Sequence, residues 1–365
     1  MRDKPIITEI EGISKSFIEW LIIEGDDHLI AKKRTTPLQL YALESLISRM
    51  RQKHKKRSDI EGDLTKRKTG FKGELALDYE LGKLQGNNYY IFQDLRLKSG
   101  HLYFQLDTLL LTKHFGLILE IKNIKGTLFF DNEFGQMIRT YEDKEEGFKD
   151  PLIQAGAQRS LLREFLKENK LETIPIEYFI VISHASTILK SSQGYHDVKE
   201  RVFHADHLIQ KIASLQKKYK NIQVKKSKLD EIKQKLLSSH SPLLSIPLEY
   251  YQITKEEILP GVHCPSCSHL GMERIYGKWS CPKCKFTSVT AHEQAIIDYL
   301  LLLNPTISNS QCRKFLGLKS RKSAHIILNR MNLEKTGTNK GTVYRLKEGE
   351  AHIMGNRHIN RGSGT

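Results

Sequence analysis

The stretch that decides the fold reads GLILEIKN, Gly116 to Asn123, an apolar run of strand length that carries an acid and a lysine two residues apart. Because side chains alternate between the two faces of a β-strand, Ile118, Glu120 and Lys122 are predicted to share one face. Glu120 and Lys122 then lie about 6.6–7 Å apart along the strand, so both head groups can address one phosphate. A solvated salt bridge between the two side chains is the alternative.

A second acid comes from the stretch just before it. In FQLDTLLL, residues 104–111, Asp107 interrupts an apolar run. If the two strands form a hairpin across residues 112–116, Asp107 lies beside Glu120 on the same face. Two carboxylates in a partly apolar site repel each other unless a divalent cation lies between them. The pair therefore predicts a Mg²⁺ or Mn²⁺ site that activates water, with Lys122 orienting that water and stabilising developing charge.

The surrounding segments alternate between helical and strand patterns. Helices are expected in residues 36–50, 70–84, 150–169 and 200–212, and strands in residues 89–97, 103–112, 116–131 and 176–183. Gly116 and Gly126 mark the bends of the strand region around Glu120. This order of elements is typical of an α/β domain.

These segments, in this order, resemble the NERD (nuclease-related) domain, a branch of the PD-(D/E)xK restriction-endonuclease-like superfamily. The resemblance covers roughly residues 30 to 210 and implies a core of a mixed sheet flanked by helices. It places the family's functional positions on residues of this chain: its glycine-glutamate motif on Gly73 and Glu74, its metal-binding aspartate on Asp107, its ExK motif on Glu120 and Lys122, and its helix glutamine on Gln154.

The resemblance also implies a set of metal ligands. The carboxylates of Asp107 and Glu120 and the backbone carbonyl of Ile121 would hold the ion, and Glu74 would project from the first helix toward them. Gln154 is expected to contact phosphate or metal-bound water. The family's usual Asn-Pro is here Asp150 followed by proline, and aspartate caps a helix as well as asparagine. A degenerate domain that binds nucleic acid without cutting it is the alternative.

Two CxxC motifs place Cys264 and Cys267, then Cys281 and Cys284, with thirteen residues between the pairs. Each motif puts two thiolates on one side of a tight turn, and two such turns supply the tetrahedral thiolate set that Zn²⁺ prefers. The surrounding sequence resembles a zinc ribbon. Four thiolates leave no open coordination position, so a structural Zn²⁺ is expected. A redox dithiol or an empty pair of turns is the alternative, and Cys312 is expected to be free.

The segment after the cysteines resembles a winged helix. Its pattern predicts one amphipathic helix, two further helices separated by Gly317, and a two-stranded wing. In the last helix Ile326, Ile327 and Met331 are expected to face the core. Phosphate and base contacts are expected from basic side chains, namely Arg313, Lys314, Lys319, Arg321, Lys322, Lys340 and Arg345. Use of this segment for protein contacts is the alternative.

Composition supports a polyanionic partner. The chain has 58 Lys+Arg against 42 Asp+Glu, a formal charge of +16. DNA is favoured over RNA, and the oligomeric state is left open. No stretch approaches the ~18 apolar residues of a membrane span, so no membrane partner and a cytoplasmic location are expected.

We expect six segments: an N-terminal extension (1–29), a NERD nuclease-like domain (30–210), a basic helical connector (211–260), a zinc ribbon (261–289), a winged-helix-like domain (290–350) and a disordered tail (351–365).

The sequence thus predicts a Mg²⁺- or Mn²⁺-dependent nuclease whose zinc-ribbon and winged-helix-like segments position DNA. A non-catalytic DNA- or RNA-binding regulator with a relic of the nuclease fold is the alternative function. A protein-interaction scaffold is a third.

Overall fold

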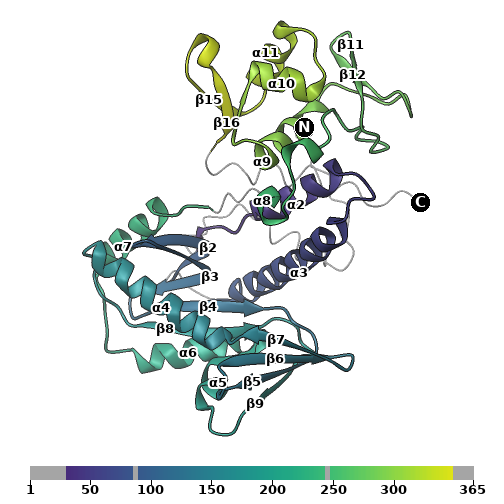
Figure 1. The fold of residues 1–365 in the computed structure, drawn as a ribbon. Helices are drawn as coiled ribbons and strands as arrows, with labels where there is room; N and C mark the ends of the chain where they lie inside the picture. The colour runs from purple at the N-terminus through teal and green to yellow at the C-terminus, as the bar shows by residue number, and fades with distance from the viewer. Residues whose placement is uncertain (1–29, 85–88, 243–246, 348–365) are drawn as a thin grey trace, which may run out of the picture. The chain divides into compact units, whose positions relative to one another are not determined.

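The computed structural model describes residues 30–84, 89–242 and 247–347. The chain divides into two compact units (Figure 1). The first unit comprises residues 1–35 and 68–242, and the second comprises residues 36–67 and 243–365. Each unit is described by itself.

The first unit is a mixed α/β domain. Its elements in chain order are β1 (Ile30–Lys32), the C-terminal part of α3 (Arg57–Leu81), β2 (Tyr89–Ser99), β3 (Leu102–Thr112), β4 (Gly116–Lys122), β5 (Thr127–Asp131), β6 (Gln136–Tyr141), β7 (Lys144–Lys149), α4 (Pro151–Glu168), β8 (Ile176–Ile182), β9 (Ile188–Ser191), α5 (His196–Arg201), β10 (Val202–His204), α6 (Leu208–Lys218) and α7 (Lys226–Ser238). The main sheet has the order β1-β2-β3-β4-β8-β10. Its β2–β3 and β3–β4 pairs are antiparallel, while β4–β8 and β8–β10 are parallel. The expected mixed sheet flanked by helices is confirmed.

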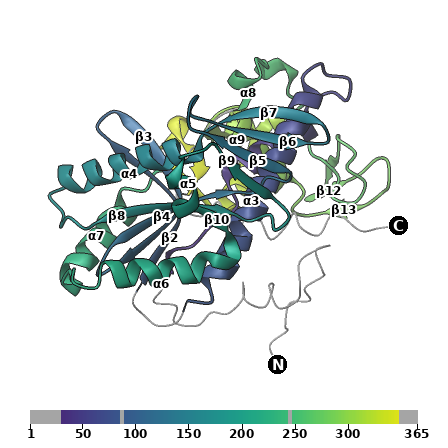
Figure 2. The ribbon, with the colours of Figure 1, turned by 90° about the horizontal axis from the view of Figure 1, so that it is seen from below.

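Strand β4 shows why this sheet carries helices on both faces. Leu117, Leu119 and Ile121 lie in one apolar cluster with residues of α3 and α6. Ile118 lies in the other cluster, with residues of α4 and α7. Figure 2 shows α4 and α6 on opposite sides of β4 and β8. The alternation expected from the sequence is therefore present, and Glu120 faces α4.

Two parts of the first unit differ from the expected pattern. Residues 200–212 do not form one helix, because β10 pairs with the edge of β8 between α5 and α6. The β-branched and aromatic side chains of Val202 and Phe203 suit that position. Residues 136–149, which gave no strand signal, form β6 and β7 of a second sheet, β7-β6-β5-β9. Its Leu128 and Phe130 pack into the α4 side of the core.

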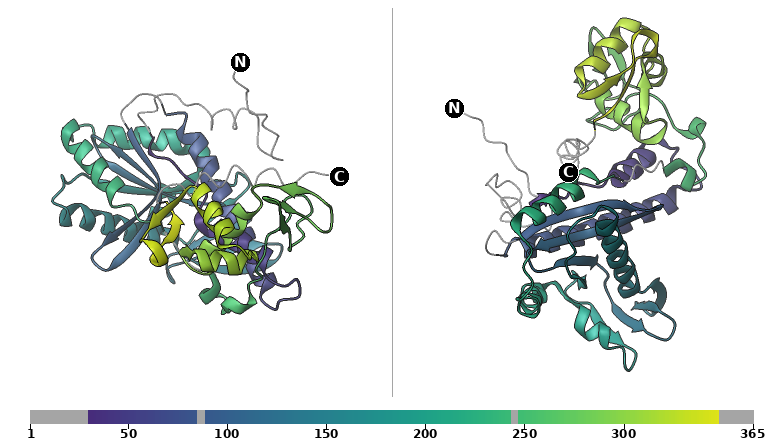
Figure 3. Two further views of the ribbon diagram at one scale, coloured as in Figure 1. Left: turned by 90° about the horizontal axis from the view of Figure 1, so that it is seen from above. Right: turned by 90° about the vertical axis from the view of Figure 1, so that its left-hand side faces the viewer.

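The second unit is built of short helices and strands (Figure 3). Its buried apolar residues form one large cluster and a smaller one of Tyr41, Ala42 and Leu301. The helices and strands are α2 (Leu38–Arg49), the N-terminal part of α3, α8 (Pro247–Tyr250), β11 (Glu273–Ile275), β12 (Lys278–Ser280), β13 (Thr287–Ser288), α9 (His292–Leu302), β14 (Thr306–Ser308), α10 (Asn309–Leu316), α11 (Arg321–Arg330), β15 (Leu333–Thr336) and β16 (Val343–Leu346). The sheets are β11-β12-β13 and β14-β16-β15. The expected order of three helices followed by a hairpin is present in residues 292–346.

The units divide the chain differently from the six expected segments. Residues 36–67 cluster with the C-terminal part of the chain, not with the nuclease-like part. Leu43 and Leu46 of α2 share their apolar cluster with Ile296 of α9. Conversely, Leu229 and Ile232 of α7, in the expected connector, lie in the core of the first unit. An amphipathic pattern shows that a helix buries one face, but not which core receives that face.

A buried ion pair within the second unit provides a stability test. Arg49 is fully buried, and its Nε donates to Asp298 Oδ2 at 2.6 Å. Replacing Arg49 by methionine is expected to lower the free energy of unfolding by about 3–5 kcal/mol, because Asp298 is left as an unpaired buried charge. Urea unfolding measures the change, with Arg51→Met at an exposed position as the control. The double variant Arg49→Met/Asp298→Leu should recover part of the loss, and equal losses in Arg49→Met and Arg51→Met would contradict the assignment.

Candidate active site

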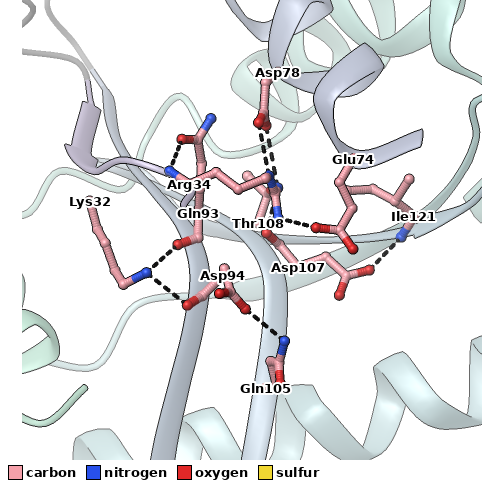
Figure 4. Close-up of polar contacts among 10 residues, drawn as sticks. All are labelled: Lys32, Arg34, Glu74, Asp78, Gln93, Asp94, Gln105, Asp107, Thr108 and Ile121. Atoms are coloured by element: carbon pink, nitrogen blue, oxygen red, sulfur yellow. Dashed lines mark hydrogen bonds and ion pairs between the residues drawn. The ribbon is translucent and has the colours of Figure 1, made fainter. Parts of the chain in front are cut away.

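Asp107 lies at a distortion between β2 and β3. The ladder pairs Gln93 with Thr108 and then Leu95 with Leu106, so Asp94 and Asp107 both fall in a gap. Asp94 has a positive φ of 53°. The register is the same on both sides of this gap, but Phe92 and Leu95 both lie in the apolar cluster on the α4 side, so the alternation of side chains shifts at Asp94. Here the Asp107 carboxylate turns toward β4 and accepts the Ile121 N–H at 2.9 Å (Figure 4).

Glu120 lies next to Asp107, as the expected hairpin requires. The β3–β4 register pairs Thr108 with Leu119, and one further step brings Asp107 opposite Glu120. Ile121 directs its N–H toward β3, so its carbonyl faces the same edge, beyond the last pair of that ladder. The two carboxylates and this carbonyl, the three expected metal ligands, are thus brought to one end of the hairpin.

The Glu120 carboxylate is 3 % exposed and accepts hydrogen bonds at both oxygens. Lys122 Nζ and Gln154 Nε2 each donate to Oε1 at 2.7 Å, and Gln158 Nε2 donates to Oε2 at 3.0 Å. Lys122 also donates to Gln154 Oε1 at 3.3 Å. The salt bridge between Glu120 and Lys122 is therefore present, and it forms part of a network that joins β4 to α4.

Glu74 reaches the cluster from α3 through Arg34. The Arg34 guanidinium donates to Glu74 Oε2 at 2.5 Å and to Asp78 Oδ2 at 2.8 Å, and it also bonds the Asp107 carbonyl at 2.9 Å (Figure 4). Gly73 permits this approach of α3. A Cβ at Gly73 would lie 2.4 Å from the Asn123 Cβ, so any side chain would push α3 away from β4.

Negative charge in this cluster exceeds the positive charge that faces it. Burial and the neighbouring Glu120 and Glu74 hold the pKa of Asp107 well above its usual range. Burial, opposed by Arg34 and assisted by nearby acids, raises the pKa of Glu74 to about 7. Hard oxygen ligands with surplus negative charge fit a divalent cation such as Mg²⁺ or Mn²⁺. The donor set formed by Asp107, Glu120 and the Ile121 carbonyl is therefore compatible with the expected ion.

Sequence reasoning missed two side chains of this network. Gln158 lies one helical turn after Gln154 and was expected to share its helical face, but only Gln154 was given a role; the structure makes Gln158 a second partner of Glu120. Arg34 stands among Lys32 and Lys33 and carries no local signal. Only the fold shows that its side chain, 2 % exposed, lies between the acids of α3 and β3.

The four cysteines of the CxxC motifs converge in the second unit. Their sulfur atoms all lie within 4.8 Å of one another, and Cys264–Cys284 and Cys267–Cys281 are each 3.6 Å apart. A tetrahedron with Zn–S bonds of 2.3 Å has edges of about 3.8 Å. The two turns also share one backbone pattern: Cys264 N–H donates to the His269 carbonyl and Cys281 N–H to the Phe286 carbonyl. The four thiols can therefore bind Zn²⁺, and this cluster is consistent with a zinc ribbon.

The basic residues expected to bind nucleic acid lie on three parts of residues 309–346. Arg313 and Lys314 are on α10, Lys319, Arg321 and Lys322 are at the start of α11, and Lys340 and Arg345 are in the hairpin region. All are exposed except Arg313, which is half-buried. Arg345 is paired with Glu334 at 2.8 Å.

The expectation that Ile326 faces the core is wrong. Ile326 is 38 % exposed, while Ala324, Ile327 and Leu328 supply the buried face of α11.

The first unit thus defines a class: α/β domains with acids and a lysine gathered at one end of a mixed sheet. Residues 69–183 match the family model of the nuclease-related domain, NERD, so this chain carries a nuclease-related domain. The matched range includes Glu74, Asp107, Glu120, Lys122 and Gln154. No match to the chain was found among curated proteins or among solved structures. In residues 30–84, 89–242 and 247–347, no helix is long and apolar enough to cross a membrane.

Proposed function

We propose that the first unit is a metal-dependent nuclease that hydrolyses phosphodiester bonds of nucleic acid. One observation carries this proposal: Asp107 and Glu120, from adjacent strands, stand side by side beside Lys122, with Glu74 held nearby by Arg34. Neighbouring buried carboxylates repel each other, and a divalent cation held by their oxygens offsets that repulsion.

In the proposed site the ion is held by the Asp107 and Glu120 carboxylates and by the Ile121 carbonyl. A divalent cation bound there lowers the pKa of a water molecule and offsets negative charge on the phosphate. The Ile121 N–H fixes the Asp107 carboxylate at 2.9 Å, and Gln158 fixes Glu120 at 3.0 Å, so both ligands are oriented in advance.

Lys122 and Gln154 supply the polar contacts around the scissile phosphate in this proposal. The Lys122 ammonium lies 2.7 Å from Glu120 and is partly exposed, so it can donate a hydrogen bond to a phosphate oxygen. Water adds to phosphorus, one P–O bond of the diester breaks, and the departing oxygen takes up a proton. Arg34 acts as a positioning residue because it holds Glu74 and the Asp107 backbone without facing the substrate.

Incubation of plasmid and single-stranded substrates with Mg²⁺ or Mn²⁺ tests this function. Wild-type protein should cut, and Asp107→Ala and Glu120→Ala should not. Cutting that persists in both variants would refute the site.

We further propose that the second unit positions DNA through a structural zinc ribbon and a winged-helix-like segment. Support comes from the cysteine cluster and from the exposed basic side chains at the start of α11, where Ser320 caps the helix by accepting the Ser323 N–H at 3.2 Å. The N-terminus of a helix favours contact with phosphate. Such phosphate contacts would add affinity for DNA that a single metal site does not supply.

The double variant Arg321→Gln/Lys322→Gln is expected to weaken DNA binding about equally for all sequences and to reduce the salt dependence by roughly two charges. The reason is that these exposed side chains would neutralise phosphates. Fluorescence anisotropy over a salt series measures the effect. The pair Lys53→Gln/Lys55→Gln, exposed residues of the same unit, is the control. An equal loss in both pairs would contradict a local DNA contact.

A non-catalytic regulator is the second candidate. It is favoured by the hydrogen bonds at both Glu120 oxygens, because metal binding must compete with Lys122 and Gln154 for Oε1. This candidate predicts retarded mobility of nucleic acid with strong salt dependence and no metal-dependent product.

A further inference from the structure

The exposed face of the β2–β3 hairpin continues from the acid cluster toward the turn at residues 99–102. Beyond the distortion at Asp94, Leu95, Leu97, Phe104 and Leu106 are buried in the core. The other face carries Arg96 and Lys98 on β2, and Tyr103 and Gln105 on β3. The ladder places Arg96 opposite Gln105, and Lys98 opposite Tyr103. These four residues are called the hairpin track.

The track joins the acid cluster without a break. Gln105 Nε2 donates to Asp94 Oδ1 at 2.6 Å, and the charge of Asp94 contributes to the raised pKa of Glu74 (Figure 4). Gln105 is two residues from Asp107 along β3, and Tyr103 is four. At 3.3–3.4 Å per residue, Tyr103 lies about 13 Å from Asp107. The sign of the charge changes along this line, from the acids to Arg96 and Lys98.

Tyr103 has the features of a stacking platform. It is 51 % exposed on the outer face of the hairpin. The Arg96 guanidinium lies 4.0 Å from the centroid of its ring, and the Lys98 ammonium lies 5.6 Å from it. Arg96 donates one N–H to the Ser241 carbonyl at 3.1 Å. Because a guanidinium carries five N–H groups, Arg96 can also donate to a phosphate. An exposed aromatic ring with cations beside it is the combination that proteins use to bind single strands.

We propose that the hairpin track binds an unpaired nucleic-acid strand, with one base stacked on Tyr103 and its phosphates near Arg96 and Lys98, and that it leads this strand to the acid cluster. The proposal rests on the proposed nuclease function and adds its substrate class, which is single-stranded or locally unpaired nucleic acid. A paired base keeps its faces inside the duplex stack, so Tyr103 cannot stack on it. The strand that reaches Asp107 is therefore unpaired for a few nucleotides on this side.

Binding is tested in the full chain with Asp107→Asn, so that the probe is not cut. The probes are a labelled single-stranded oligonucleotide of about 12 nucleotides, within the range of known single-strand sites, and a duplex of the same sequence. Tyr103→Ala should weaken single-strand binding by about 5- to 150-fold, the range of one lost base–aromatic stack, and change duplex binding far less. Lys98→Gln should reduce the salt slope for the single strand by about 0.7.

The matched control is Phe134→Ala, which removes an aromatic ring that is 74 % exposed in the same unit and lies beside Glu133. It should leave both affinities unchanged. Because the second unit also carries basic residues, contact with the track is read directly by photocrosslinking of an oligonucleotide that contains 5-iodouracil. The crosslinked peptide should contain Tyr103. Equal affinities for Tyr103→Ala and Phe134→Ala, or crosslinks confined to the second unit, would overturn the proposal.

The same proteins with Asp107 intact separate this proposal from the proposed function. If wild-type protein cuts nucleic acid, and Tyr103→Ala cuts single strands as fast as wild type, the track is refuted and the nuclease stands. If wild-type protein cuts nothing with Mg²⁺ or Mn²⁺ but the binding and crosslinking results hold, the nuclease is refuted and the track stands as a binding surface.

Discussion

Replacing Asp107 by asparagine is expected to reduce metal-dependent cleavage by about 10³-fold or more, because loss of a metal ligand forfeits several kcal/mol of transition-state stabilisation. The same change should leave the protein as stable as before or more stable. The pKa of Asp107 is raised in the folded state by burial and by Glu120 and Glu74. The folded state therefore binds this proton more tightly than the unfolded state, so the ionised carboxylate costs stability at neutral pH. Initial rates on plasmid DNA and thermal unfolding without added Mg²⁺ measure the two effects.

The matched control for this prediction is Asp206→Asn, a change at a side chain that is 76 % exposed. It should alter neither the cleavage rate nor the unfolding temperature. A fall in the unfolding temperature of Asp107→Asn would mean that the carboxylate is structural and mainly caps the Ile121 N–H. Residual cleavage at the wild-type rate would remove Asp107 from the site. Glu120→Gln is a second test of whether the acids act as metal ligands. This change removes the negative charge of Glu120, but the amide can still accept a hydrogen bond from Lys122.

The second large effect is expected from loss of zinc. A chelator, or Cys281→Ser, should unfold the ribbon, because binding of a structural Zn²⁺ contributes about 10–16 kcal/mol to folding in small zinc modules. Trp279 reports this change, since it is 1 % exposed on β12 and its indole N–H donates to His292 Nδ1 at 2.9 Å. Its fluorescence should shift to that of a solvated indole, measured in a Trp20→Phe background that removes the second tryptophan of the chain.

Cys312→Ser is the control for the zinc prediction. Cys312 is fully buried in the same unit, and burial raises the pKa of its thiol to about 12. It lies outside the cysteine cluster, so its replacement should leave a zinc content of one ion per chain. If the chelated protein keeps the fluorescence of buried Trp279, the ion is not structural. If Cys281→Ser retains one tightly bound zinc, the four-thiolate site is wrong.

Much of the site was predictable because its signals are local. Alternation within β4 placed Glu120 and Lys122 on one face, and a short connection from β3 made the hairpin that brings Asp107 beside Glu120. The four cysteines carry their geometry in their spacing. In each case the residues of the site are separated by few positions in the sequence, so few backbone arrangements are compatible with the residue pattern.

The rest of the site was not predictable because it depends on long-range packing. Arg34 is 40 residues from Glu74 and 73 from Asp107, and nothing near it distinguishes it from the lysines beside it. The distortion at Asp94 arises only where β2 and β3 pair. The hairpin track becomes visible only when the ladder sets Arg96 and Lys98 beside Tyr103.

The sequence by itself determined the alternation of β4, the hairpin of acids, the thiol cluster and the helices with clear amphipathic faces. The tertiary structure decided which core each helix joins, as α2 and α7 show. It also decided that a buried guanidinium would face the surplus of carboxylates. The physical reason is that periodicity specifies which face of an element is apolar, whereas the partner of that face is chosen by the complementarity of surfaces far apart in the chain.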